Sequence, residues 1–210
     1  PNTPIYCTQN GKDALVGHYF KDWNFVTVKT GDSLPIGNGK ELLFVDFPIS
    51  SYPDTMFCYL TKDHILFSSG LFGQHFSSEV LFNDLVDQCE LNFETIKFFA
   101  NTLTPFSKVI TSKINDYIRK NIPLEMICPS HGIIWRDNPL QIVTKYLMWA
   151  NSYNENQITI IYDTMYNATR SVAEKIAEGI YSADTHVNVK LFNASVNNRC
   201  DLVTEVFRSK

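Results

Sequence analysis

The stretch ITIIYDTMYNATRSVAEKIAEGI, residues 158–180, sets the fold class of this chain. Its first part, ITIIYD, is rich in β-branched residues, as buried strands are, and its last part, RSVAEKIAEGI, has helical spacing. A second strand and helix, VNVKLFN and DLVTEVF, follow at residues 187–193 and 201–207. This βαβα order predicts a parallel sheet with a right-handed crossover, and therefore an α/β fold.

The loop between the first strand and helix of this run is the clearest candidate binding site. It consists of Thr164, Met165, Tyr166, Asn167, Ala168 and Thr169. Free backbone N–H groups at a helix N-terminus, the positive end of the helix dipole and two hydroxyls favour an anion such as a phosphate. Because the loop has no lysine and no GxxxxGK motif, it suits the phosphate of flavin mononucleotide (FMN) rather than a nucleoside triphosphate. In the alternative interpretation, Thr164 and Thr169 only cap the helix.

The first third of the chain predicts a different architecture. Short β-type runs alternate with turn residues, so we expect a meandering, largely antiparallel sheet without long helices. The expected strands of residues 4–69 are IYCT, NFVTV, ELLFVDF, MFCYL and HILFSS.

The spacing becomes helical from Glu79 to Asn121, and a second helix is expected to start at Thr104-Pro105. We expect the Leu, Ile and Phe side chains of this region to be core. A buried strand, EMICPS, then ends at His131-Gly132, and a helix runs from Asn138-Pro139 to about residue 153. The polar stretch 151–157 is long enough to act as a linker between two units.

The composition excludes several classes of protein. The chain has 210 residues, 44% of them hydrophobic, and a net charge of −4 without long runs of either sign. This argues against a nucleic-acid-binding or anionic-membrane surface. Five scattered cysteines without CxxC spacing indicate reduced thiols, and no apolar run has the length of a membrane span. We therefore expect a soluble, cytoplasmic protein without a signal peptide.

Several longer segments carry a resemblance to a known family. YDTMYNATRSVAEKIAEGI resembles the first strand, phosphate loop and helix of a flavodoxin-like domain. The segments DWNFVTVKTGDSLPIGNGKELLFVDFP, LFGQHFSSEVLFNDLVDQCEL, ANTLTPFSKVITSKI and SHGIIWRDNPLQIV resemble the metallo-β-lactamase-like domain of flavodiiron proteins. The resemblance implies a partial αββα lactamase-like domain, residues 1–153, followed by the first βαβα of a flavodoxin-like domain, residues 158–210.

This resemblance implies a nitric oxide or oxygen reductase in which FMN passes electrons to a di-iron site. It also implies a head-to-tail homodimer, in which the FMN of one subunit serves the iron of the other, and a redox partner such as a rubredoxin-type donor. In such a dimer Trp135 would line a flavin edge from the partner subunit, while ordinary packing is the alternative for Trp135.

The iron ligands that the resemblance implies can be sought one by one. The family carries an HxExDH cluster, which would lie before Pro1, then a His, an Asp and a final His in three later loops. At these loop positions the chain has Ser51 in SYPDT, Gly70 in SSGLFG and His131 in SHG. A serine hydroxyl is a poor iron ligand and glycine offers no side chain, so we expect no di-iron centre and no catalytic residue here. His131 is alternatively a hydrogen-bonded structural residue.

Three functions remain after this comparison. The chain resembles a flavodiiron reductase, an oxidoreductase, but with its di-iron site lost. The alternative is a non-catalytic relict, or a module for assembly or flavin binding. A hydrolase of the lactamase superfamily ranks last, because it needs a metal and the same ligand cluster.

Overall fold

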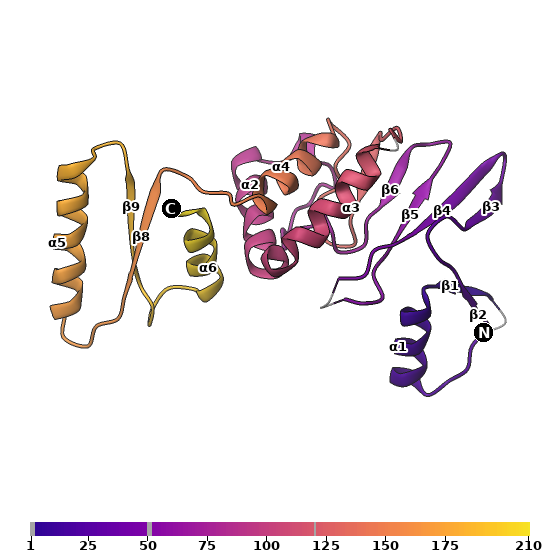
Figure 1. Cartoon of the computed structure of the whole chain (residues 1–210), viewed down its shortest axis with the longest axis horizontal. Coiled ribbons are helices and arrows are strands. Elements are labelled where there is room, and N and C mark those ends of the chain that lie inside the picture. The colour runs from indigo at the N-terminus through magenta and orange to yellow at the C-terminus, as the bar shows by residue number, and fades with distance from the viewer. Residues whose placement is uncertain (1–2, 50–51, 120) are drawn as a thin grey trace.

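The computed structural model of the chain describes residues 3–49, 52–119 and 121–210. Figure 1 shows a central sheet covered by helices, with a small α/β unit from the N-terminus on one side and a second from the C-terminus on the other. The chain is therefore α/β, as the strand and helix order predicts.

The central sheet has the strand order β3-β4-β5-β6-β7. These strands are β3 (Ser33–Gly37), β4 (Lys40–Asp46), β5 (Met56–Leu60), β6 (Ile65–Phe67) and β7 (Met126–Cys128). The first four pair antiparallel, as expected for β4, β5 and β6, and β7 joins β6 in parallel. The expected strands IYCT and NFVTV do not belong to this sheet and pair with each other in parallel, against the expectation. Strand β3 lies in a segment that sequence reasoning treated as turn, because Pro35 and several glycines interrupt it. Proline is tolerated there, because β3 is an edge strand.

Three helices build the core against one face of this sheet. They are α2 (Gln88–Phe98), α3 (Ser107–Arg119) and α4 (Leu140–Ala150). The strand ending before residue 131 and the helix after Pro139 match the expectation, and Pro105 lies in a 3-10 turn, η3 (Thr104–Phe106), that leads into α3 as expected. A single π-helical turn, η2 (Phe99–Leu103), joins α2 to η3. Phe99, Ile110 and Tyr146 from these helices are fully buried.

The expectation that residues 79–86 are helical and buried was wrong. The structure has only a 3-10 turn there, η1 (Asn83–Leu85), and the side chains of Leu81 and Leu85 are 61% and 55% exposed. The segment instead pairs with the chain after β7, where the Asn83 N–H donates to the Ile134 carbonyl at 3.0 Å. On α3, Ile110 and Ile114 are buried as expected, but Val109 and Ile118 are exposed.

The N-terminal unit contains a helix that the sequence analysis excluded. Strands β1 (Ile5–Cys7) and β2 (Phe25–Thr27) pair in parallel, and helix α1 (Gln9–Tyr19) connects them. The absence of long helices before residue 69 was therefore a wrong expectation. α1 contains two glycines and shows no clear apolar stripe, so its start is marked mainly by the Thr8 hydroxyl, which accepts the Gly11 N–H at 3.0 Å.

The C-terminal unit has the predicted βαβα order. Strands β8 (Gln157–Tyr162) and β9 (Asn188–Asn193) pair in parallel, with α5 (Ala168–Ala183) and α6 (Arg199–Arg208) as the helices. Helix α6 also packs on α2 and η2, since the Phe207 ring lies 5.7 Å from the Phe99 ring and the Lys97 ammonium pairs with Asp201 at 2.6 Å. The unit is therefore docked on the central part of the chain.

The stretch expected as a linker is held in place by the last helix. The Glu155 carboxylate accepts two hydrogen bonds from the Arg208 guanidinium, at 2.7 and 2.8 Å, and its backbone N–H donates to the Arg208 carbonyl. Arg208 also pairs with Glu205, which is 4% exposed and is bound by Lys190 of β9. This ion network fixes α6 against the sheet, and a division of the chain at residues 153–158 stays a prediction.

Candidate functional site

A pocket of about 250 Å³ lies where the loop after β6 meets the loop after β7. Gly70 and His131, which the sequence analysis assigned to one site, both line it. Polar neighbours on the same walls are Tyr52, Asp54, Thr55, Ser69, His75 and Ser130. Ser51, the third position of that assignment, lies outside the described residues. The structure thus brings together two positions far apart in sequence.

Backbone hydrogen bonds join the two loops of this pocket. The Ser130 N–H donates to the Ser69 carbonyl at 2.7 Å, and the Ser68 N–H donates to the Cys128 carbonyl at 3.1 Å. Within the first loop, the Ser68 hydroxyl donates to the Leu71 carbonyl at 2.7 Å. Gly70 is therefore held at a fixed place opposite the second loop.

A buried glutamine adds a second connection between the loops. The Gln74 side-chain carbonyl accepts the Ile133 N–H at 2.6 Å, and its amide donates to the Ile133 carbonyl at 3.2 Å. Gly132 has φ +82°, and a Cβ there would lie 1.8 Å from the Gln74 Oε1 atom. The turn after His131 therefore requires glycine, both for its backbone conformation and for space.

The first loop keeps two residues in the left-handed region, Ser69 at φ 53° and Phe72 at φ 63°. Backbone strain of this kind persists where surrounding contacts enforce it. Here the Phe72 N–H donates to the Tyr146 hydroxyl at 3.0 Å, and the Trp135 indole N–H donates to the Phe72 carbonyl at 2.8 Å. Burial raises the pKa of Tyr146, so this hydroxyl stays neutral.

Trp135 is only 1% exposed and belongs to the core. Packing was one of two roles that the sequence allowed for Trp135. The other role, contact with a flavin, stays a prediction. The neighbouring Arg136 is exposed, binds Asp84 through two hydrogen bonds and lies over the Phe82 ring at 3.8 Å. The Arg136 guanidinium lowers the pKa of Asp84, since it hydrogen-bonds the carboxylate directly.

The side chains that line the pocket include two imidazoles, of His75 and His131, and one carboxylate, of Asp54. Among residues 3–49, 52–119 and 121–210, no three His, Cys, Asp or Glu side chains are grouped to hold a metal. His75, the other imidazole of the pocket, stands edge-on against Phe98 at 5.2 Å. Two iron ions need several imidazole and carboxylate ligands in fixed positions. A Cβ built at Gly70 would meet nothing within 4 Å, so this wall has open space instead of a ligand.

Residues 164–167 of the predicted loop precede α5, a well-formed helix that already includes Ala168 and Thr169. Its N-cap is Asn167, at φ 64°, and the Asn167 side chain makes no capping hydrogen bond. The alternative that Thr164 and Thr169 cap this helix is therefore not what the structure has. The first turn of α5 carries no acidic residue, and Met165 and Tyr166 are more than 80% exposed. The N-terminus of α5 is the positive end of its dipole, and binding of a phosphate by these residues stays a prediction.

One negative charge lies close to this loop. The Asp163 carboxylate accepts the Thr164 N–H at 2.8 Å and the Ser195 hydroxyl at 2.7 Å. Figure 1 places the connection from β8 to α5 at the far end of the C-terminal unit, away from the central sheet. The loop and the pocket of Gly70 therefore lie in separate parts of the chain.

Sequence reasoning missed Gln74 and Tyr146, which position the pocket loops. A polar residue inside the apolar run LFGQHF was a signal for Gln74. Tyr146 gave none, since it lies in the apolar stripe of α4 and its hydroxyl reaches a loop far away in sequence. No helix in the described part of the chain combines the length and hydrophobicity needed to cross a membrane.

Comparison with known proteins agrees with the fold. The family model described as "ODP family beta lactamase" matches residues 2–132. The anaerobic nitric oxide reductase flavorubredoxins of Vibrio vulnificus (strain YJ016) and of Klebsiella pneumoniae subsp. pneumoniae are 53% and 54% identical over 100% of this chain. The chain covers 43% and 44% of these two proteins, so it spans less than half the length of the curated relatives.

Solved structures support the same fold. Rubredoxin oxygen:oxidoreductase from Desulfovibrio gigas superposes with a TM-score of 0.92 at 26% identity, over 98% of this chain and 51% of the other. The flavodiiron protein from Giardia intestinalis superposes with a TM-score of 0.90 over 98% of this chain and 50% of the other; at 23% identity it supports the fold alone. The resemblance to flavodiiron proteins stated from the sequence is thereby confirmed.

Proposed function

The chain belongs to the ODP family of β-lactamase-like proteins, and from this premise we propose that it supplies the scaffold and the FMN-phosphate loop of a flavodiiron-type oxidoreductase, without an iron pair of its own. The scaffold is the lactamase-like part, residues 1–153. The phosphate loop opens a flavodoxin-like part, residues 158–210. Such a chain would bind a flavin or serve in assembly of the enzyme.

The observation that carries this proposal is the chemistry of the pocket. His131 and Gly70 line the same pocket, and Gly70 offers no side-chain donor atom. A bridging carboxylate at that position would both ligate two cations and offset their charge, and a hydrogen atom does neither. We therefore propose that this pocket does not assemble two iron ions from the described residues.

The phosphate loop supports the flavin side of the proposal. Helix α5 is 16 residues long, so its N-terminus carries a developed dipole, and the Asn167 side chain does not occupy its first turn. The hydroxyls of Thr164 and Thr169 would donate hydrogen bonds to the FMN phosphate. Bound FMN would supply one- and two-electron redox chemistry, while these residues only hold and orient its phosphate.

The remaining parts of the proposal concern the whole reductase. Relatives that share the full length of this chain are named nitric oxide reductases. We propose nitric oxide or oxygen as the substrate of the complete enzyme, a rubredoxin-type donor, a head-to-tail homodimer and a cytoplasmic location. In such a dimer, the pocket of one subunit would face the flavin of the other.

Flavin binding is tested by comparing FMN with riboflavin, which lacks the phosphate. Titration of either flavin with the protein, followed by flavin fluorescence, should give FMN the higher affinity. Replacing both hydroxyls in a Thr164→Val, Thr169→Val variant should lower FMN affinity about tenfold, since charge-assisted hydrogen bonds are lost, and leave riboflavin unchanged. Thr185→Val, at an exposed position outside the loop, is the matched control. Equal affinity for both flavins would contradict the phosphate-loop role.

A second candidate function is the reductase activity itself. It is favoured by the identity of 53% along the entire chain and by a pocket of about 250 Å³ with open space at Gly70. Nitric oxide consumption by the purified chain, dependent on added iron and on a reduced donor, would establish this function. The main proposal expects no such consumption.

A further inference from the structure

The chain contains two Asn-Gly pairs, Asn10-Gly11 and Asn38-Gly39. Asparagine is a thermolabile residue, and it loses its side-chain amide most readily before glycine, because a residue without a side chain leaves its backbone nitrogen unhindered. The two pairs have different surroundings in the folded chain. Their reactivity can therefore be compared within one protein.

Asn38 and Gly39 form the tip of the hairpin between β3 and β4. Gly37 pairs with Lys40, and φ is 54° at Asn38 and 70° at Gly39, as in a two-residue type I′ turn. Both tip residues are exposed, and the Gly39 N–H donates to no described residue. A Cβ built at Gly39 would meet only the Lys62 ammonium, at 3.8 Å, among the described atoms. No packed side chain therefore prevents Asn38 from rotating about its backbone.

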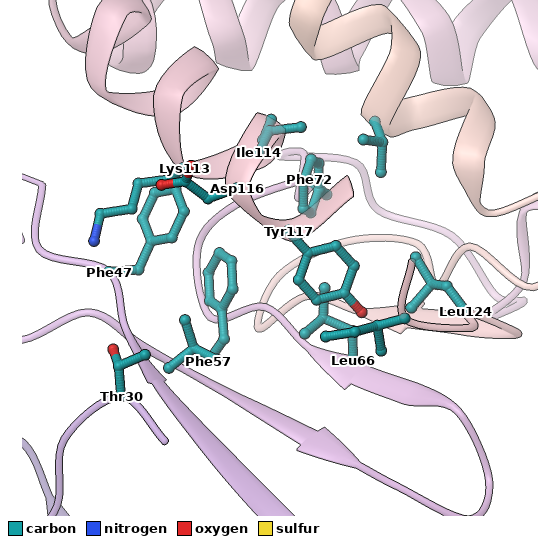
Figure 2. A pocket seen from close by; sticks show the side chains of 13 residues that line it. Thr30, Phe47, Phe57, Leu66, Phe72, Lys113, Ile114, Asp116, Tyr117 and Leu124 are labelled. Atoms are coloured by element: carbon teal, nitrogen blue, oxygen red, sulfur yellow. The ribbon is translucent and has the colours of Figure 1, made fainter. Parts of the chain in front are cut away.

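The base of this hairpin is held in place, unlike its tip. Thr30, just before β3, lines an apolar pocket of about 130 Å³ together with Phe47 and Phe57 (Figure 2), and its hydroxyl accepts the Asp46 N–H at 2.9 Å. Figure 1 shows the hairpin extending away from the helices that cover the sheet. A chemical change at the tip would therefore leave the core intact.

A lysine of the neighbouring turn lies against the peptide bond that would react. Lys62, between β5 and β6, donates a hydrogen bond from its ammonium group to the Asn38 carbonyl at 3.2 Å. Lys40 binds Asp63 of the same turn at 2.8 Å, which keeps the two turns together. The Asn38 carbonyl is conjugated with the Gly39 nitrogen, so a cation at this oxygen stabilises the negative charge that forms when the nitrogen loses its proton.

The surroundings of Asn10 oppose the same reaction. Asn10 lies in the first turn of α1, and the Gly11 N–H donates to the Thr8 hydroxyl at 3.0 Å. The side-chain amide of Asn10 donates to the Pro53 carbonyl at 3.0 Å. Hydrogen bonds thus hold both the backbone nitrogen and the side-chain amide that would react, and rotation of Asn10 would break the start of the helix.

We propose that Asn38 is a site of spontaneous deamidation, promoted by Lys62, and that the fold protects Asn10. The Gly39 nitrogen loses its proton and bonds to the side-chain carbonyl carbon of Asn38, and the side-chain nitrogen leaves as ammonia with that proton. Water then opens the cyclic imide at either carbonyl, which gives aspartate or isoaspartate. Both products place a new carboxylate beside Lys62, and isoaspartate also adds a carbon atom to the backbone of the turn.

Incubation of the folded chain at neutral pH, followed by tryptic digestion and mass spectrometry, measures both sites. Trypsin cleaves after lysine, so residues 1–12 and residues 30–40 form separate peptides. Asn38 should react at least about tenfold faster than Asn10, because only Asn10 is protected by local structure. In concentrated urea the two asparagines should react at similar rates. A rate at Asn38 no higher than at Asn10 in the folded protein, or a difference that persists in urea, would overturn the proposal.

Two lysine variants test the part assigned to Lys62. Lys62→Met removes the cation and keeps a long side chain, so deamidation at Asn38 should slow about two- to fivefold, the range of an exposed charge contact. Lys175→Met is the matched control, since Lys175 pairs with Glu178 on the exposed face of α5, and it should leave the rate unchanged. Equal rates in wild type and a folded Lys62→Met protein would overturn the role of Lys62. Far-UV circular dichroism verifies that both variants are folded.

Discussion

Gln74 binds the backbone of Ile133 through both ends of its amide, accepting the N–H at 2.6 Å and donating to the carbonyl at 3.2 Å. The glutamine is fully buried. This contact fixes the distance between the loop of Gly70 and the loop of His131. The shape of the candidate pocket therefore depends on a residue that does not line it.

Replacing Gln74 should destabilise the protein strongly. Gln74→Leu keeps most of the volume but leaves the Ile133 N–H and carbonyl buried without partners, which should cost about 2–4 kcal/mol of unfolding free energy. Urea denaturation gives the value. Gln141→Leu is the control, since Gln141 makes a single hydrogen bond to the Asp137 carbonyl at a more exposed place. Equal losses for the two variants would contradict the role assigned to Gln74.

Two glycine-to-alanine substitutions should change the free energy of unfolding in opposite directions. Gly132→Ala places a Cβ against the Gln74 Oε1 atom in a left-handed backbone, so we expect a loss of about 2 kcal/mol or more. Gly17→Ala, inside α1 with nothing within 4 Å of its Cβ, should stabilise by about 0.5–1 kcal/mol. Thermal unfolding of both variants measures the difference. A neutral Gly132→Ala would show that the turn after His131 relaxes freely.

The Glu155–Arg208 pair should make stability depend on pH in the acid range. The guanidinium, mainly through its hydrogen bonds, lowers the pKa of Glu155 below the ordinary carboxyl value of 4.5. The stabilising contribution is therefore complete above that ordinary value and is lost as pH falls through the lowered pKa of the folded protein. Since the pair is partly solvated, we expect about 1 kcal/mol or less.

Unfolding midpoints of wild type and Glu155→Gln between pH 3 and pH 7 test this expectation. The two curves should lie apart at neutral pH and converge in acid. Glu174→Gln is the matched control, because Glu174 pairs with Arg170 on the exposed face of α5. A constant gap between wild type and Glu155→Gln at every pH would rule out the ion pair as its cause.

The Tyr146 hydroxyl should be needed for the strained loop. Tyr146→Phe keeps the ring packed against Phe72 and Phe99 but removes the acceptor of the Phe72 N–H. We expect a loss of about 1–3 kcal/mol and faster amide exchange at Phe72, because this backbone group becomes unpaired. Tyr181→Phe, whose hydroxyl accepts the Val189 N–H from a half-exposed position, should cost less. Unchanged exchange at Phe72 would contradict the assignment.

The parts of the fold with clear periodicity could be predicted from sequence. The βαβα run could be predicted because ITIIYD has a clear strand pattern and RSVAEKIAEGI has a clear helix pattern. Helix α1 could not be found this way, since its apolar residues do not repeat at helical spacing and two glycines interrupt it. The spacing of Leu81 and Leu85 wrongly predicted a helix, because the chain at Leu81 and Asn83 pairs with Ile134 and only a 3-10 turn follows, at Asn83–Leu85.

The site could be predicted in part for a different reason. Gly70 and His131 were brought together by a family resemblance, and the structure places both on one pocket. The residues that fix their positions, Gln74 and Tyr146, act through contacts about 60 and 75 residues away in sequence, a separation at which local patterns carry no signal.

Our central proposal is that the pocket of Gly70 and His131 does not assemble a pair of iron ions. The direct measurement is the iron content of the purified chain after anaerobic incubation with ferrous iron and removal of the excess, determined by mass spectrometry of the metal. The account predicts no stoichiometric iron, and no change in iron content for His131→Ala. Two iron ions retained per chain, and lost on replacing His131, would contradict it.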